Sequence, residues 1–121
     1  MHYYRSNSQV LDAKGTLPCH LEVDYDNNLL FTSNYGSGTF TAYRIDESTG
    51  VIQNEVAVFN YGKGSGVYDF GFQDNSHAHA AYKFKNYVFV MDLGSDRIWR
   101  YKVNKDTRVF FKSEYFMESH A

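Results

Sequence analysis

The chain of 121 residues lacks the features that mark secreted, membrane-spanning and nucleic-acid-binding proteins. Its one cysteine, Cys19, has no partner for an internal disulfide, which suits a reducing compartment. No apolar run reaches the ~20 residues needed to cross a bilayer, and the first residues, Met-His-Tyr-Tyr-Arg, lack the apolar core of a signal peptide. A net charge of −2 argues against nucleic acid or a membrane surface as partner. We therefore expect a cytosolic chain that forms at most one ordinary domain.

Helical periodicity is also absent, and the residues that are abundant favour strands. Apolar residues make up 43% of the chain and aromatic residues 18%, almost all of them Tyr and Phe. These aromatic residues favour β-structure, and the nine glycines supply turns between strands. The composition therefore predicts an all-β fold.

Eight segments are predicted to be strands. Residues 19–24 alternate between apolar and polar side chains, which indicates a strand with two different faces. The predicted strands are residues 19–24, 29–34, 39–46 and 51–59, followed by residues 79–84, 87–91, 97–103 and 109–115. A weaker strand is predicted at residues 3–11. Residues 60–76 form the longest irregular stretch, which is typical either of a functional loop or of plain variability.

The two halves of the chain are copies of one pattern. Four pairs are separated by 58 residues: Asn34 and Asp92, Gly36 and Gly94, Ser37 and Ser95, and Tyr43 and Tyr101. Before the first turn, His20 aligns with His79 at a separation of 59 residues, which predicts a turn one residue shorter in the second copy. Such a repeat indicates an architecture built from successive equivalent units.

Four-stranded units of about 40–50 residues are typical of β-propeller blades. We predict that residues 1–16 are the outer strand of a preceding blade with a linker, and that residues 17–75 and 76–121 are two blades. A propeller typically needs about 4–8 blades. The two predicted blades therefore need the remaining blades, or self-association, to close the ring.

Strand direction brings several polar residues to one face of the predicted blades. His77 and His79 stand at the start of an inner strand, and the Asp92–Arg97 turn returns the chain to the same face. His20 and the turn after Asn34 are expected in equivalent places one blade earlier. These groups are predicted to meet at one mouth of the central channel, where cleft-type sites form.

The two histidines have three open interpretations. Residues two apart on a strand point the same way, so His77 and His79 would hold a zinc ion if a third ligand came from elsewhere. Either one is also suited to act as a general base near neutral pH. In the structural alternative, they cap the loop and hydrogen-bond its backbone.

Structural alternatives exist for the other candidates as well. Asp92 in a Gly-containing turn is expected to bond nearby amides, and Arg97 either pairs with Asp92 or Asp96 or grips an anionic substrate group. Cys19 faces the opposite side from His20 and is expected to be a small packed residue. Trp99, Tyr43, Tyr101 and the Phe residues are expected to pack between blades.

Four motifs, in order, resemble the lactonase, seven-bladed β-propeller family. They are Pro18-Cys-His-Leu-x-Val-Asp24, Ser33-Asn-Tyr-Gly-Ser-Gly38, Ser76-His-Ala-His79 and Asp92-Leu-Gly-Ser-Asp-Arg97. The family includes propeller-type 6-phosphogluconolactonases and the carboxy-cis,cis-muconate cyclising enzyme. The resemblance implies a partial seven-bladed propeller in which this chain supplies roughly two blades.

The resemblance also implies a function and a set of site residues. It implies hydrolysis of a sugar lactone such as 6-phosphogluconolactone, with His79 as the catalytic base and His77 beside it, without metal or other cofactor. Arg97, Asp92, Asn34 and His20 are the expected substrate-binding residues. The arginine and glutamate partners of the family's histidine lie in later blades that this sequence does not contain. Three alternatives stay open: muconate-type cyclisation, a non-catalytic propeller that binds a sugar phosphate or a protein, and a truncated product with no stable fold.

Overall fold

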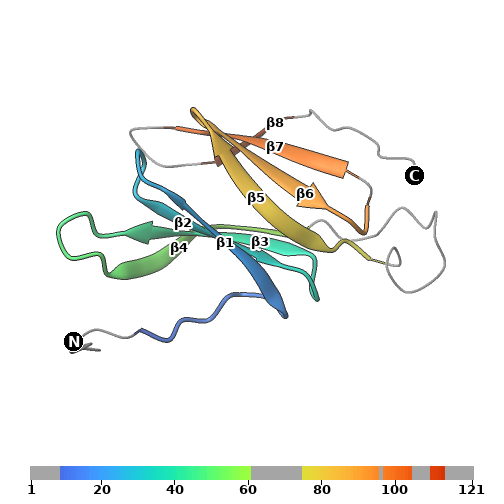
Figure 1. Cartoon of the computed structure of the whole chain (residues 1–121), viewed down its shortest axis with the longest axis horizontal. Helices are drawn as coiled ribbons and strands as arrows, with labels where there is room; N and C mark the ends of the chain where they lie inside the picture. Colours follow the sequence, from blue (N-terminus) through green and yellow to red (C-terminus); the bar gives the residue numbers. More distant parts are fainter. Residues whose placement is uncertain (1–8, 61–74, 96, 105–109, 114–121) are drawn as a thin grey trace, which may run out of the picture.

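The structure is a computed structural model that describes residues 9–60, 75–95, 97–104 and, for the backbone, 110–113. The described residues form two four-stranded antiparallel sheets with strand orders β1-β2-β3-β4 and β5-β6-β7-β8 (Figure 1). The first sheet consists of β1 (Pro18–Asp24), β2 (Leu29–Asn34), β3 (Thr39–Ile45) and β4 (Ile52–Asn60). The second consists of β5 (Ala78–Phe84), β6 (Tyr87–Asp92), β7 (Arg97–Val103) and β8 (Phe110–Ser113). The predicted all-β class and the two antiparallel units are confirmed.

Most strand bounds agree with the sequence prediction to within one residue. The region 3–11 differs, because residues 9–11 are not in a strand and residues 3–8 lie outside the described part of the chain. The side-chain amide of Gln9 explains the difference: Nε2 donates to the Ile52 carbonyl at 3.0 Å, and Oε1 accepts from the Ile52 amide at 2.8 Å. One side chain thus makes the pair of bonds that a backbone residue would make at the start of β4.

Other predictions fall on residues that the structure does not describe. The centre of the expected loop at residues 60–76 lies outside the described residues, since these stop at Asn60 and resume at Asn75. The same holds for Asp96 and for the predicted ends of the last strand. No helix in the described part of the chain is long and apolar enough to cross a membrane.

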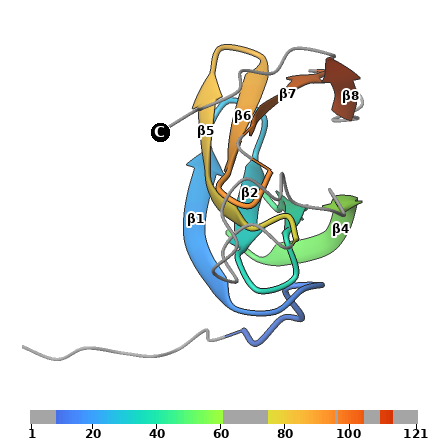
Figure 2. The same cartoon turned by 90° about the vertical axis from the view of Figure 1, so that its right-hand side faces the viewer.

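The two sheets pack face to face around one apolar core (Figure 2). Leu29, Phe31 and Phe40 of the first sheet and Val88, Val90 and Tyr101 of the second are completely buried in it. Phe59 and Tyr101 stack across the junction with ring centroids 4.3 Å apart. Each such side chain contributes about 1.5–3 kcal/mol when fully buried. The expected packing of aromatic residues between blades is confirmed for these rings.

Tyr43 differs from the other aromatic residues because it lies on the opposite face of the first sheet. Its neighbour Ala42 belongs to the core, and adjacent residues of a strand face opposite sides. The Tyr43 hydroxyl instead donates to the carbonyl of Asp12, which lies ahead of β1. Tyr43 therefore does not pack between these two sheets, and its expected packing against another blade stays a prediction.

The strand pairing in the two sheets corrects the alignment of the two copies of the repeat. Pro18 pairs with Asn34 in the first sheet, and Ala78 pairs with Asp92 in the second. Asn34 and Asp92 are 58 residues apart, as predicted, but Pro18 and Ala78 are 60 apart. The turn between β5 and β6 is therefore two residues shorter than the turn between β1 and β2, and not one.

This correction changes which residue matches the second histidine. At the offset of 60, the counterpart of His79 is Cys19, and the counterpart of His20 is Ala80. The register shifts at Cys19 in β1 and at His79 in β5, so both sit at a bulge. The bulge lies at the same place in both sheets, so the misalignment of His20 with His79 came from the turn after the strand, which is two residues and not one residue shorter in the second copy.

Candidate functional site

The start of β5 and the turn after β6 meet at one end of the sheets, as strand direction predicted. The amide of His77 donates to Oδ1 of Asp92 at 2.8 Å, and the amide of Leu93 donates to the carbonyl of His77 at 3.1 Å. The first sheet repeats the second of these bonds, since the Tyr35 amide donates to the Leu17 carbonyl at 2.9 Å. We call Tyr35, His77, His79, Asp92 and Arg97 the mouth cluster.

His77 is buried and held by the first sheet. Its Nδ1 lies 2.6 Å from the backbone carbonyl oxygen of Tyr35, and the two rings stack with centroids 4.5 Å apart and planes 18° apart. A carbonyl oxygen only accepts hydrogen bonds, so Nδ1 is the protonated nitrogen. In the neutral ring, the lone pair that a base or a ligand needs is consequently on Nε2.

His79 is exposed, unlike His77. Its ring meets the Tyr35 ring edge-on, with centroids 6.2 Å apart and planes 85° apart. Both imidazoles of the H-x-H motif therefore contact one tyrosine of the neighbouring sheet. Exposure to solvent gives His79 the access to water that a hydrolytic base requires.

Asp92 anchors the turn that completes the mouth cluster. It is only 3% exposed, and its two carboxylate oxygens accept four hydrogen bonds. The donors are the His77 amide at 2.8 Å, the Ser95 amide at 3.2 Å, the Ser76 hydroxyl at 2.7 Å and the Trp99 Nε1 at 3.2 Å. A carboxylate has about four acceptor positions, so these four hydrogen bonds occupy all of them. The contacts match the structural interpretation of Asp92, and its role in substrate binding stays a prediction.

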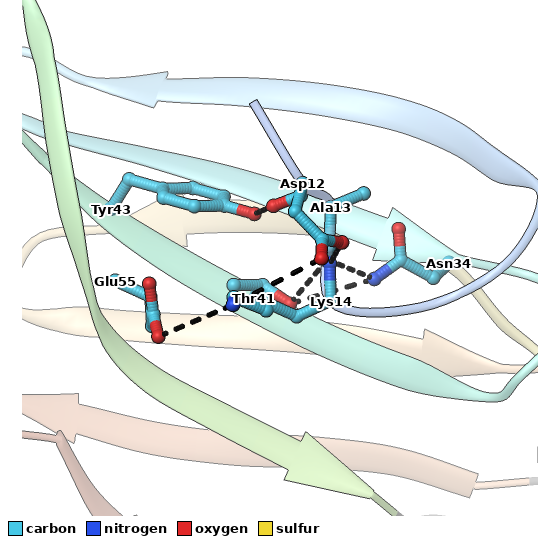
Figure 3. A network of polar contacts seen from close by, with 7 residues as sticks. All are labelled: Asp12, Ala13, Lys14, Asn34, Thr41, Tyr43 and Glu55. Atoms are coloured by element: carbon cyan, nitrogen blue, oxygen red, sulfur yellow. Dashed lines mark hydrogen bonds and ion pairs between the residues drawn. The ribbon is translucent and has the colours of Figure 1, made fainter. Parts of the chain in front are cut away.

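Asn34 occupies the matching position in the first sheet and is completely buried. Its Nδ2 donates to the Ala13 carbonyl and to the Thr39 hydroxyl, both at 3.0 Å, as Figure 3 shows for Ala13. Thr41 donates to the same Ala13 carbonyl at 2.9 Å, so Asn34 and Thr41 together hold the Ala13 backbone against the first sheet. The predicted contribution of Asn34 to substrate binding is untested by these contacts.

Arg97 and His20, the two remaining candidates, lie in different surroundings. Arg97 begins β7 opposite Asp92, and its guanidinium lies 5.5 Å from the centre of the Trp99 ring. His20 lies between the inner strands, where its Nδ1 accepts from the Ala81 amide at 3.4 Å and its ring is 5.2 Å from Tyr82. The structure thus places Arg97 beside Asp92 in the second sheet and His20 against β5.

Cys19 does not behave as the small packed residue that the sequence predicted. It is exposed, although its Sγ lies 3.2 Å from the carbonyl oxygen of His79. Partial burial of the thiol raises its pKa, against a smaller opposing effect from the Tyr35 backbone. Within the described residues, no group of three or more His, Cys, Asp or Glu side chains is placed to hold a metal ion, so His77 and His79 gain no third ligand there.

Tyr35 is the member of the mouth cluster that sequence reasoning missed. It follows Asn34 in a motif that was noticed for its glycines, and its counterpart in the second sheet is Leu93. An aromatic residue in a turn of small polar residues was the available signal. Its contacts with His77 and His79 depend on how the two sheets pack, which the sequence pattern does not specify.

Comparison with known proteins bears on the family and the fold of the chain. The family described as "Lactonase, 7-bladed beta-propeller" matches residues 4–119. A 6-phosphogluconolactonase of Formosa agariphila is 38% identical over 97 residues, which cover 78% of this chain and 27% of that protein. An uncharacterised protein of Staphylococcus aureus strain USA300 is 30% identical over 114 residues, covering 93% of this chain and 33% of that protein.

Solved structures agree on the fold. The structure of a periplasmic gluconolactonase of Pseudomonas aeruginosa superimposes with a TM-score of 0.74 at 21% identity, covering 85% of this chain and 30% of that one. This likeness concerns the fold alone. The chain spans about a third or less of the length of the curated relatives it matches.

Proposed function

The chain belongs to the lactonase, seven-bladed β-propeller family, and we propose that it supplies two blades and the histidine base of a propeller that hydrolyses a sugar lactone. One observation carries the proposal: His79 is exposed at the mouth cluster, beside a second histidine whose protonated nitrogen is set by a backbone carbonyl. The similarity to a protein named 6-phosphogluconolactonase supports 6-phosphogluconolactone as the substrate.

The proposed reaction needs one proton to be moved twice. An imidazole nitrogen of His79 takes a proton from water while the hydroxide oxygen bonds to the lactone carbonyl carbon. The carbonyl oxygen becomes an oxyanion, which nearby cationic groups stabilise. The bond between that carbon and the ring oxygen then breaks, and the ring oxygen receives the proton from His79. The product is the open hydroxy acid.

Arg97 is the proposed contact for the anionic part of the substrate. It begins β7 at the same end of the sheets as His77 and His79, and its planar guanidinium suits bidentate bonding to a phosphate. Asp92 contributes indirectly, since it holds the His77 amide and the β6–β7 turn in place.

The test is a turnover assay of the complete propeller with 6-phosphogluconolactone, corrected for spontaneous hydrolysis. We expect His79→Gln to lower kcat by about 10²-fold or more, as loss of a general base does. Phe84→Gln is the matched control, because Phe84 is an exposed residue at the far end of the same strand and should leave kcat unchanged.

Two results would reject the proposal. Wild-type turnover by His79→Gln would remove His79 from the reaction. A protein that the lactone stabilises against heat without any turnover would instead be a binding propeller.

A further inference from the structure

Tyr35 links the two histidines to the sheet that does not contain them. It lies in the turn between β2 and β3 of the first sheet, whereas His77 and His79 lie at the start of β5 in the second. The Tyr35 ring stacks on His77 at 4.5 Å and meets His79 edge-on at 6.2 Å. The same residue's carbonyl accepts from Nδ1 of His77 at 2.6 Å.

The first sheet shows that these contacts are specific to one blade junction. The counterparts of His77 and His79 in the first sheet are Leu17 and Cys19, which have no imidazole to orient. The counterpart of Tyr35 in the second sheet is Leu93, which is 46% exposed. The backbone bond that closes the turn is nevertheless present in both sheets, so the turn forms with either leucine or tyrosine.

Aromatic stacking is worth only about 0.5–1.5 kcal/mol beyond burial, so the main effect of Tyr35 is geometric and not energetic. Stacked and edge-on contacts with one rigid ring set the planes of both imidazoles. The hydrogen bond from Nδ1 of His77 to the Tyr35 carbonyl also fixes which ring nitrogen of His77 carries the proton. An imidazole whose plane is set in advance presents its lone pair in one direction, which is what a general base needs.

We propose that Tyr35 is the positioning residue of this site, and that its ring holds the two imidazoles of the H-x-H motif in a fixed mutual orientation. This inference rests on the proposed function only for its effect on turnover. The orientation itself is measurable without activity.

The decisive variant is Tyr35→Leu, which installs the residue found at the matching place in the second sheet. We expect kcat for the lactone to fall by about 10- to 100-fold with KM changed less than about threefold, because misplaced catalytic groups affect the reacting step. Tyr35→Phe keeps the ring and should restore kcat to within about twofold of the wild type. Phe84→Leu is the matched control, since Phe84 is an exposed aromatic residue at the end of β5 away from the mouth cluster.

A second measurement separates this inference from the proposed function. In protein labelled with ¹³C and ¹⁵N histidine, the three-bond couplings that report the side-chain torsions of His77 and His79 should change in Tyr35→Leu and stay unchanged in Phe84→Leu. Torsions are the readout because loss of the tyrosine ring current alone moves the chemical shifts of nearby rings. Unchanged couplings in Tyr35→Leu would overturn the positioning role, even if turnover fell. Changed couplings in a protein whose His79→Gln variant keeps full turnover would support the positioning role and reject the hydrolytic one.

The kinetic outcome can also overturn the inference. If Tyr35→Leu keeps wild-type kcat while His79→Gln loses it, the base does not need the tyrosine. If Tyr35→Phe is as impaired as Tyr35→Leu, the hydroxyl and not the ring is what matters, and positioning by the ring is wrong.

Discussion

Asn34 and Asp92 occupy the same position in the two sheets and have opposite hydrogen-bonding roles. The amide nitrogen of Asn34 donates to oxygens of Ala13 and Thr39, whereas the carboxylate of Asp92 accepts from four donors. Both side chains fasten the segment that enters the inner strand. The residue type follows its surroundings, which are acceptors in the first sheet and donors in the second.

Asp92→Asn is expected to destabilise the protein strongly despite its small change in shape. An amide has one acceptor oxygen, and its NH₂ group would face one pair of the donors that now bond the carboxylate. Loss of two charge-assisted hydrogen bonds predicts a fall of about 3 kcal/mol in the free energy of unfolding, measured by urea denaturation. Asn34→Asp is the reciprocal change and should also destabilise, because it places a carboxylate against the Ala13 carbonyl. A stable Asp92→Asn variant would contradict the anchoring role.

Lys83 and Asp24 form an ion pair between the two sheets at the end away from the mouth cluster. Nζ of Lys83 lies 2.7 Å from Oδ1 of Asp24, which is completely buried, and 2.6 Å from Oδ2 of Asp26. Removing the partner of a buried charge predicts a loss of roughly 3 kcal/mol for Lys83→Met. Lys85→Met is the control, since Lys85 is exposed and lies over the Phe84 ring. Equal unfolding free energies for the two variants would show that the pair adds nothing.

The same pair predicts a dependence on alkaline pH. Burial alone would lower the pKa of Lys83, but the hydrogen bonds and charges of Asp24 and Asp26 outweigh it and raise the pKa above 10.5. A raised pKa means that the pair's contribution is fully present below the unfolded pKa of about 10.4 and is lost as pH rises through the folded value. The difference in melting temperature between wild type and Lys83→Met should therefore shrink above about pH 10.5. A difference that stays constant to pH 12 would contradict this assignment.

Gly38→Ala is expected to destabilise the protein for two reasons, and Gly50→Ala measures one of them alone. Both Gly38 and Gly50 have a positive φ, +67° and +75°, which costs an alanine roughly 1–2 kcal/mol. A Cβ at Gly38 would also overlap the backbone carbonyl of Ser76, which precedes β5, whereas a Cβ at Gly50 meets nothing within 4 Å. Thermal melts should show a larger loss for Gly38→Ala than for Gly50→Ala. Equal losses would mean that the sheets separate easily at this point.

Cys19 is expected to react slowly for an exposed thiol. Burial of its sulfur raises its pKa, so a smaller fraction is thiolate at pH 8 than in an unfolded chain. Alkylation by iodoacetamide, monitored by mass spectrometry, should be slower in the folded protein than in urea. The difference between the two alkylation rates should decrease as pH rises. Faster alkylation of the folded form would show that the carbonyls near the thiol do not restrict it.

The strands and turns of this protein follow from local sequence. Alternation along residues 19–24 and the apolar run of residues 29–34 predict two strands that the structure confirms almost to the residue. Asn34 and Asp92 were also paired correctly, because the turns after them have equal length. In these segments the chain's own neighbours decide the conformation, so the sequence contains the needed information.

The mouth cluster was predicted in part, for a related reason. Strand direction alone requires His77 and the turn after Asp92 to meet, and their backbone bonds confirm it. The alignment of the two copies put His20 in the place that Cys19 occupies. The length of the turn after each of the strands β1 and β5 decides this match, and identical residue types in two copies do not report it.

The sequence by itself determined the all-β class, the repeat and the end of the sheets at which His77 and His79 lie. Only the tertiary structure decided that Tyr35 contacts both rings and that Cys19 matches His79. These relations depend on the register of β1 and β5 and on how one sheet lies against the next. The register of β1 and β5 is set by pairing with β2 and β6, and the sheet packing by contacts such as that between Tyr35 and His77, which are 42 residues apart. A local pattern contains no record of these contacts.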